Sequence, residues 1–227
     1  MNKQLLVYSG LACFFAVVGP VRAGDMMTNE VSARIDAVLS RMNELSKGPG
    51  RTTELIQQFK DEDIAAWPAA FNGKAATALH RRGEAYYFMK DYERALKDLE
   101  LAAKLVPDNG YILNSLGDVY RARKDEQRAL QAYLAAFEVD QKQHAGKAYG
   151  YMPLSATLSA ANILVNQARY QEALKVVGRY DDTDIRNMAP MWGVRLLRMQ
   201  GQIQAGMGNE EEALAKFKAA LQREKNK

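Results

Sequence analysis

The chain has 227 residues, with 31 basic and 27 acidic side chains and a formal net charge of +4. Its apolar fraction of 48% and charged fraction of 26% are typical of soluble globular chains, which excludes wholesale disorder. A single cysteine excludes an internal disulfide framework and a multi-cysteine zinc site. The length suits one or two domains that bury a real core.

Residues 1–23 have the pattern of a secretory signal peptide. Lys3 gives a positive start, the run from Leu5 to Val21 is uncharged, and Ala23 is a small residue before Gly24. The run lies at the short end of what spans a membrane. We therefore expect cleavage before Gly24 and an exported protein, periplasmic or secreted, with no membrane span after cleavage. An uncleaved anchor helix is the alternative.

Removal of this leader changes the composition. It takes away Lys3, Arg22 and the lone Cys13, which leaves 29 basic against 27 acidic side chains. Much of the apparent basicity is lost, so no nucleic-acid partner is expected. A mature chain without a thiol suits an oxidising compartment outside the cytoplasm.

A short sequence motif that ends in Ala-Leu occurs four times along the rest of the chain. Its alanines are Ala95, Ala129, Ala173 and Ala213. The first interval is 34 residues, and the next two, 44 and 40, equal 34 plus insertions of ten and six. Twelve residues before these alanines stand Gly83, Gly117, Ala161 and Gly201. Antiparallel helices pack closely only where small side chains meet at their crossing, so the pattern predicts four stacked helix pairs.

The pattern resembles the tetratricopeptide repeat (TPR) family. In the first unit the family's signature positions are matched by Leu79, Gly83, Tyr86, Ala95, Leu99, Ala102 and Pro107, with Arg82 as the departure. The third unit is the weakest, because Tyr180 stands where alanine is usual. The resemblance implies an all-α fold, an α-solenoid of antiparallel helix pairs in a right-handed superhelix. It places the units at 76–109, 110–143, 154–187 and 194–227, with an insertion loop at 144–153.

Residues 24–75 are expected to form an N-terminal helical cap or a divergent repeat. A helix is predicted over 28–46, with Val31, Ile35 and Met42 on one stripe, followed by a break at 48–50. A second helix is predicted around 55–59, and a third, short one is interrupted at Pro68. A separate docking helix that pairs with another chain is the open alternative.

The last predicted helix carries an apolar stripe of Leu214, Phe217 and Leu221. An exposed apolar stripe at the end of a repeat array favours self-association, so a homo-oligomer through these residues is possible. A helix amphipathic enough to tolerate the exposure is the equally supported alternative.

The sequence offers little catalytic chemistry. It contains no metalloprotease, nucleophile-elbow or phosphate-loop motif. His80 and Glu84 share a helical face, but a metal site needs at least three ligands, and no third is visible nearby. We therefore expect no enzymatic activity, no cofactor and no metal.

The resemblance implies binding through the concave groove that the first helix of each unit lines. Mapped onto this chain, the candidate partner-binding residues are His80, Glu84, Tyr87, Asn114, Asp118, Arg121, Asn162, Arg195, Arg198 and Gln202. Family members that bind the C-terminal carboxylate of a peptide have lysine and asparagine at these positions of the first unit. This chain has His80 and Glu84 there, so we expect no such carboxylate-binding site. The groove is expected to run from acidic (Glu84, Asp118) to basic (Arg195, Arg198), with Asn114 and Asn162 able to hydrogen-bond an extended backbone.

Together these features predict a non-catalytic scaffold or adaptor of the bacterial envelope that binds a protein or an extended peptide. The alternative is a structural subunit that self-associates through its terminal helices.

Overall fold

The computed structural model describes residues 29–46, 51–60, 62–143 and 151–225, and in these ranges the regular structure is helical throughout. The α-helices are α1 (Asn29–Ser46), α2 (Thr52–Phe59), α3 (Asn72–Phe88), α4 (Tyr92–Leu105), α5 (Gly110–Ala122), α6 (Glu126–Gln143), α7 (Tyr151–Asn166), α8 (Tyr170–Val177), α9 (Asp182–Asn187), α10 (Pro190–Gly206) and α11 (Glu210–Lys225). Two short 3-10 helices, Ile64–Ala66 and Ala69–Phe71, flank Pro68.

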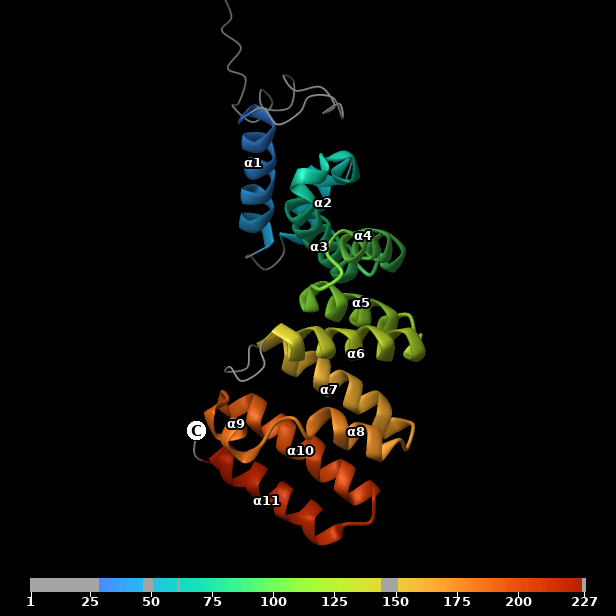
Figure 1. Ribbon diagram of the computed structural model, residues 1–227, viewed down its shortest axis with the longest axis vertical. Coiled ribbons are helices and arrows are strands. Elements are labelled where there is room, and N and C mark those ends of the chain that lie inside the picture. The colour runs from blue at the N-terminus through green and yellow to red at the C-terminus, as the bar shows by residue number, and fades with distance from the viewer. Residues whose placement is uncertain (1–28, 47–50, 61, 144–150, 226–227) are drawn as a thin grey trace, which may run out of the picture.

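The helices stack in pairs along one long axis, with α1 at one end and α11 at the other (Figure 1). The pairs α3–α4, α5–α6 and α10–α11 pack most extensively, and α7 packs on both α6 and α8. The first helices of successive units also touch, α3 on α5, α5 on α7 and α7 on α10. This is the expected α-solenoid, and the fold class is confirmed.

Small residues lie where paired helices cross, as the repeat pattern predicts. A Cβ added to Gly117 would lie 2.5 Å from the ring of Tyr133, and one added to Gly83 would lie 2.8 Å from Leu99 Cγ. Ala95 and Ala129, on the facing helices, are fully buried. The crossings of the first, second and fourth units therefore each hold one glycine against one large side chain.

The turn inside each pair repeats one backbone conformation. Lys90, Lys124 and Ala168 have φ values of 63°, 63° and 56°, and Gly208 has 84°. These four positions follow the same 34-, 44- and 40-residue intervals as the repeat alanines. Only the fourth turn uses glycine, so the other three adopt a left-handed conformation that costs L-residues energy.

The buried side chains form two cores joined at α5. One core extends from α1 to α5 and includes Ala132 of α6, and the other extends from α6 to α11. Leu113 and Tyr120 of α5 pack against both. The two halves are therefore coupled through the α5–α6 pair.

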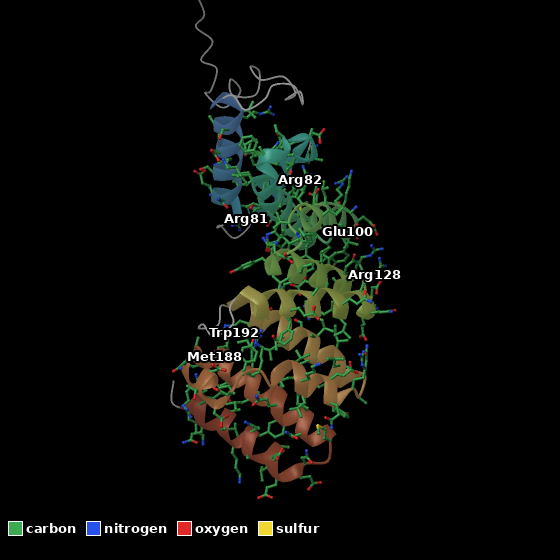
Figure 2. The ribbon with its side chains drawn as sticks, in the orientation of Figure 1. Arg81, Arg82, Glu100, Arg128, Met188 and Trp192 are labelled. Atoms are coloured by element: carbon green, nitrogen blue, oxygen red, sulfur yellow. The ribbon has the colours of Figure 1, made fainter. Side chains whose placement is uncertain are left out.

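The N-terminal segment is tied to the first repeat by Arg82, which lies between α2 and α4 (Figure 2). Its guanidinium binds both carboxylate oxygens of Asp98, at 2.6 and 2.8 Å, and donates to the carbonyls of Phe59 and Glu62 at 2.9 and 2.8 Å. Arg82 and Asp98 are both buried. The departure from the family signature at this position thus serves as a structural tie.

The third unit differs most from the others. Its second helix, α8, ends at Val177, and the short α9 follows, begun by a capping box of Asp181 and Asp184. Tyr180 lies between them and is fully buried, with its hydroxyl 3.3 Å from Thr157 Oγ1. Tyr180 fills the core from a loop, so it does not occupy the helical alanine position that the sequence alignment gave it.

The apolar stripe predicted on α11 is only partly exposed. Leu214 and Leu221 are 52% and 53% exposed, but Phe217 is half-buried, with its ring against Gly201 of α10. Phe217 therefore packs at the helix crossing while part of its side chain stays exposed, so the predicted stripe is partly open.

Two other expectations fall outside the described residues: the signal peptide at 1–23 and residues 144–150 of the insertion loop at 144–153. Within the described ranges, no helix is long and apolar enough to cross a membrane.

Candidate functional site

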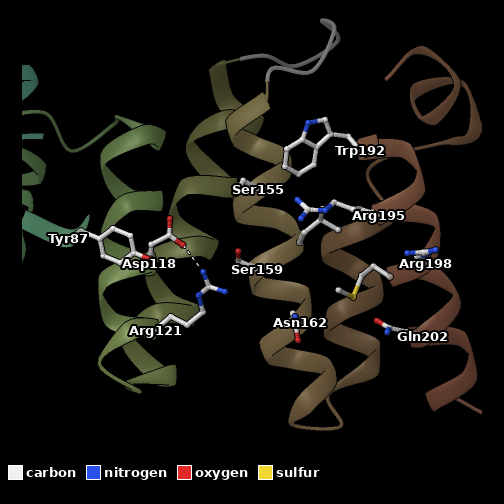
Figure 3. A pocket seen from close by; sticks show the side chains of 12 residues that line it. Tyr87, Asp118, Arg121, Ser155, Ser159, Asn162, Trp192, Arg195, Arg198 and Gln202 are labelled. Carbon is white, nitrogen blue, oxygen red and sulfur yellow. Dashed lines mark hydrogen bonds and ion pairs between the residues drawn. The ribbon is translucent and has the colours of Figure 1, made fainter. Parts of the chain in front are cut away.

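A cleft of about 490 Å³ crosses the first helices of the second, third and fourth units (Figure 3). Its floor is α7, which contributes Ser155, Leu158, Ser159 and Asn162. One wall consists of the end of α3 and α5, with Tyr87, Asp118 and Arg121, and the other is α10, with Trp192, Arg195, Arg198, Met199 and Gln202. The repeat geometry brings these helices side by side, so residues more than a hundred positions apart share one cavity.

Asp118 lies at the centre of a hydrogen-bond cluster on the α5 wall. Its carboxylate accepts from the Tyr133 hydroxyl at 2.7 Å, from Arg121 Nη2 at 3.2 Å and from Asn114 Nδ2 at 3.4 Å. Burial, followed by the Asp118 charge and this hydrogen bond, raises the pKa of Tyr133. Tyr133 therefore stays a protonated donor, and three donors already hold Asp118.

The opposite wall is cationic. The Arg195 guanidinium lies over the Trp192 ring, 5.0 Å from its centroid, and extends toward α7. Arg198 pairs with Glu224 of α11 at 2.9 Å. The two arginines therefore differ, because within the described part of the chain Arg195 has no carboxylate partner.

Seven of the ten predicted groove residues line this cleft: Tyr87, Asp118, Arg121, Asn162, Arg195, Arg198 and Gln202. Glu84 lines a separate recess of about 60 Å³ between α3, α4 and α5, which Tyr87 and Asp118 also border. Asn114 is buried, with only 4% of its surface exposed, and bonds Asp118. Of the two asparagines predicted to bind a backbone, only Asn162 is open to the cleft.

His80 lies on α3 away from the cleft. Its Nε2 is 2.9 Å from Ser115 Oγ and 3.6 Å from Glu84 Oε1. Burial lowers the pKa of His80, while the Glu84 carboxylate opposes and Arg81 adds to the shift. The His80–Ser115 contact joins α3 to α5, so His80 contributes to the packing of the first two units.

No metal centre is formed by the described residues, since they contain no group of three histidine, cysteine, aspartate or glutamate side chains placed to hold an ion.

Two more lining residues, Ser155 and Leu158, also stand at groove positions of the family register, and the remaining three, Ser159, Trp192 and Met199, were missed from the sequence. Ser159 lies three residues before Asn162 on α7, and Trp192 and Met199 lie three residues before and four residues after Arg195 on α10. A helical residue one turn away projects from the same face, so the i+3 and i+4 neighbours of the mapped positions could have identified them.

Comparison with known proteins identifies the repeats. Residues 74–142 match the tetratricopeptide repeat family model. A 50-residue stretch is 46% identical to peptidyl-prolyl cis-trans isomerase D of Kluyveromyces lactis, and it covers 22% of this chain and 13% of the isomerase. The chain thus spans a small part of this curated relative.

Solved structures extend the fold likeness over most of the chain. The TPR-like repeats of a Podospora anserina kinesin light chain align over 87% of this chain and 97% of theirs, at 12% identity and a TM-score of 0.62. MamA (AMB-1) aligns over 86% of this chain and 94% of its own, at 20% identity and a TM-score of 0.59. YrrB, described as a TPR protein with an unusual peptide-binding site, aligns over 83% of this chain and 93% of its own, at 19% identity and a TM-score of 0.51. Residues 74–142 therefore match tetratricopeptide repeats, and the solved structures show that most of the chain shares the fold of such repeats.

Proposed function

We propose that this protein is a non-catalytic scaffold that binds an extended segment of a protein partner in the cleft between α5, α7 and α10. The observation that carries the proposal is the cleft itself, a cavity of about 490 Å³ lined from three repeats. Tetratricopeptide repeats form interaction scaffolds, and the similar fold of YrrB is described with a peptide-binding site.

The chemistry of the lining suits an extended backbone. A peptide in an extended conformation presents N–H and C=O groups that need partners. Ser155, Asn162 and Gln202 line the cleft with side chains that both donate and accept hydrogen bonds. Leu158 and Met199 add apolar surface between them. A largely polar cleft of this kind fits an extended segment better than the apolar face of an amphipathic helix.

The experiment is selection of a random peptide library on the purified protein, followed by binding to two tryptophan variants. Asn162→Trp fills the cleft from its floor, because Asn162 is an exposed lining residue of α7. Gln171→Trp is the matched control, because Gln171 is exposed on α8 and lies outside the cleft lining. Selected peptides should lose binding to Asn162→Trp and keep it to Gln171→Trp. Equal binding to both variants would refute the cleft as the binding site.

We also propose that the protein acts in the bacterial envelope after export. The support is the leader pattern of residues 1–23 and the absence of cysteine from the rest of the sequence. The test is expression of the full chain in a bacterial host, with fractionation and N-terminal sequencing. A periplasmic or secreted product that begins at Gly24 is expected, whereas a cytoplasmic product that retains Met1 would contradict export.

A second candidate is self-association, favoured by the exposed Leu214 and Leu221, which lie seven residues apart on α11. It predicts a dimer or larger species by light scattering that Leu214→Glu with Leu221→Glu converts to a monomer. A monomeric parent protein at every concentration would remove this candidate.

A further inference from the structure

We propose that the cleft selects segments carrying acidic side chains, and that Arg195 and Arg121 recognise a ligand carboxylate from opposite walls. This specificity rests on the proposed function, because it concerns the same cleft. It also replaces the acidic-to-basic gradient expected from the sequence with a cleft that is positive overall.

The ionisable lining residues that can carry full charge at neutral pH are one aspartate and three arginines: Asp118, Arg121, Arg195 and Arg198. The aspartate offers little to a basic ligand, because Tyr133, Arg121 and Asn114 already donate to its carboxylate. A ligand cation would have to displace these donors and would also face the arginines. The charge balance therefore favours an anionic ligand.

Arg195 is the best-prepared contact. Its guanidinium is held over Trp192, whose own side chain is buried, so the planar group has a fixed support. Arg195 is exposed, and no carboxylate within the described ranges pairs with its guanidinium. A guanidinium in this state can give two parallel hydrogen bonds to one carboxylate. Arg198 is less available because Glu224 already binds it at 2.9 Å.

Arg121 completes the arrangement from the α5 wall. Its side chain is 53% exposed, and its hydrogen bond to Asp118 uses one nitrogen, Nη2, so other N–H groups of the guanidinium can bind a ligand. Figure 3 shows Arg121 and Arg195 on either side of the α7 floor. The floor between them carries Ser155, Ser159 and Asn162, which are uncharged and can also donate to a carboxylate. No acidic side chain of the floor competes with the ligand.

The test measures binding of three synthetic peptide sets of equal length that share a Ser/Leu/Gly background and carry Glu, Gln or Lys at the same positions. The acidic set should bind most tightly to the parent protein, and raising the ionic strength should weaken it most. Arg195→Gln and Arg121→Gln should each weaken the acidic set by roughly three- to tenfold and change the neutral set little. Lys97→Gln is the control, because it removes the same charge from an exposed position on α4. Circular dichroism melts check that each variant is folded.

The outcomes separate this specificity from the binding function on which it rests. If the neutral or basic set binds as tightly as the acidic set, and Asn162→Trp abolishes that binding, acidic recognition is wrong while the cleft remains the binding site. If acidic peptides bind best but Arg195→Gln and Arg121→Gln behave like Lys97→Gln, the assigned residues are wrong. If no set binds, or Asn162→Trp has no effect, both proposals fail.

Discussion

At the residue scale, Arg82 shows how one departure from a repeat signature can connect two parts of a fold. The family resemblance marks Arg82 as a departure, yet its guanidinium makes a bidentate bond to Asp98 and donates to the carbonyls of Phe59, at the end of α2, and of Glu62, just after it. Replacing one member of such a buried pair leaves a charge without a partner in a dry environment.

We therefore predict that Arg82→Met lowers the free energy of unfolding by about 3–5 kcal/mol. The control is Arg94→Met, which breaks the exposed ion pair between Arg94 and Asp91 and should cost less than about 1 kcal/mol. Urea denaturation followed by circular dichroism measures both. Similar losses for the two variants would show that the Arg82 contacts carry no special weight.

His80 gives a prediction on pH. Burial lowers its pKa below the ordinary 6.5, so as the pH falls the unfolded chain takes up a proton before the folded chain does. The stability contribution is therefore complete above pH 6.5 and is lost as the pH falls toward the folded-state pKa. The urea midpoint should be lower at about pH 5.5 than at about pH 7.5, where few carboxylates titrate. His80→Gln should show a smaller fall, and an identical fall would contradict this role.

Residue-level roles were only partly predictable from the sequence. The mapped positions of α10 and Asn162 do line the cleft, because side-chain direction on a helix follows from register. Asn114 also has the helical register of a groove residue, but its side chain is buried and donates to Asp118, which Tyr133 of the neighbouring helix also binds. Such a contact depends on a neighbouring helix, which register alone does not reveal.

At the scale of helices, the crossings decide how closely each pair packs. Gly117 of α5 meets the Tyr133 ring, which is fully buried and hydrogen-bonded to Asp118, so the ring has little room to move. An added methyl group at this position must displace the ring or separate the helices.

Gly117→Ala should therefore destabilise the protein by about 1–3 kcal/mol, although alanine is the better helix former. Gly73→Ala is the matched control, because it lies in the first turn of α3 and an added Cβ there meets nothing within 4 Å. That substitution should be neutral or stabilise the protein by up to about 1 kcal/mol. Thermal melts give the sign of each change, and stabilisation by both would refute the packing argument.

Helix positions were predicted well where the 34-residue period is intact and less well where it is interrupted. The helix expected over 28–46 corresponds to α1, and the second unit contains α5 and α6, whereas α3 of the first unit begins at Asn72, four residues before the unit's expected start. In the third unit α8 stops at Val177, and the capping box at Asp181 starts a new helix. Gly178 and the Asp181–Asp184 spacing are local signals for this break, but the alignment to a regular repeat obscured them.

At the scale of the whole molecule, the helix pairs of the solenoid contact mainly the pairs next to them. Each pair contacts the pairs beside it, and the two cores meet at α5 through Leu113 and Tyr120. Stability in such an array is the sum of local unit and interface contributions, so damage at one end should remain local.

Gly201→Ala tests this locality, because a Cβ there would lie 2.7 Å from the Phe217 ring and disturb the α10–α11 crossing. Hydrogen exchange should show reduced protection of α10 and α11 and unchanged protection of α3 and α4. An equal loss of protection in all four helices would mean that the molecule unfolds as one cooperative unit.

The central claim is that the cleft over α7 holds an extended acidic segment. Backbone amide chemical-shift mapping with the tightest acidic peptide tests it most directly. The largest changes are expected at Arg121, Ser155, Asn162 and Arg195, on the helices that line the cleft. Changes confined to α6, α8 or the exposed leucines of α11, with the cleft unaffected, would contradict the claim.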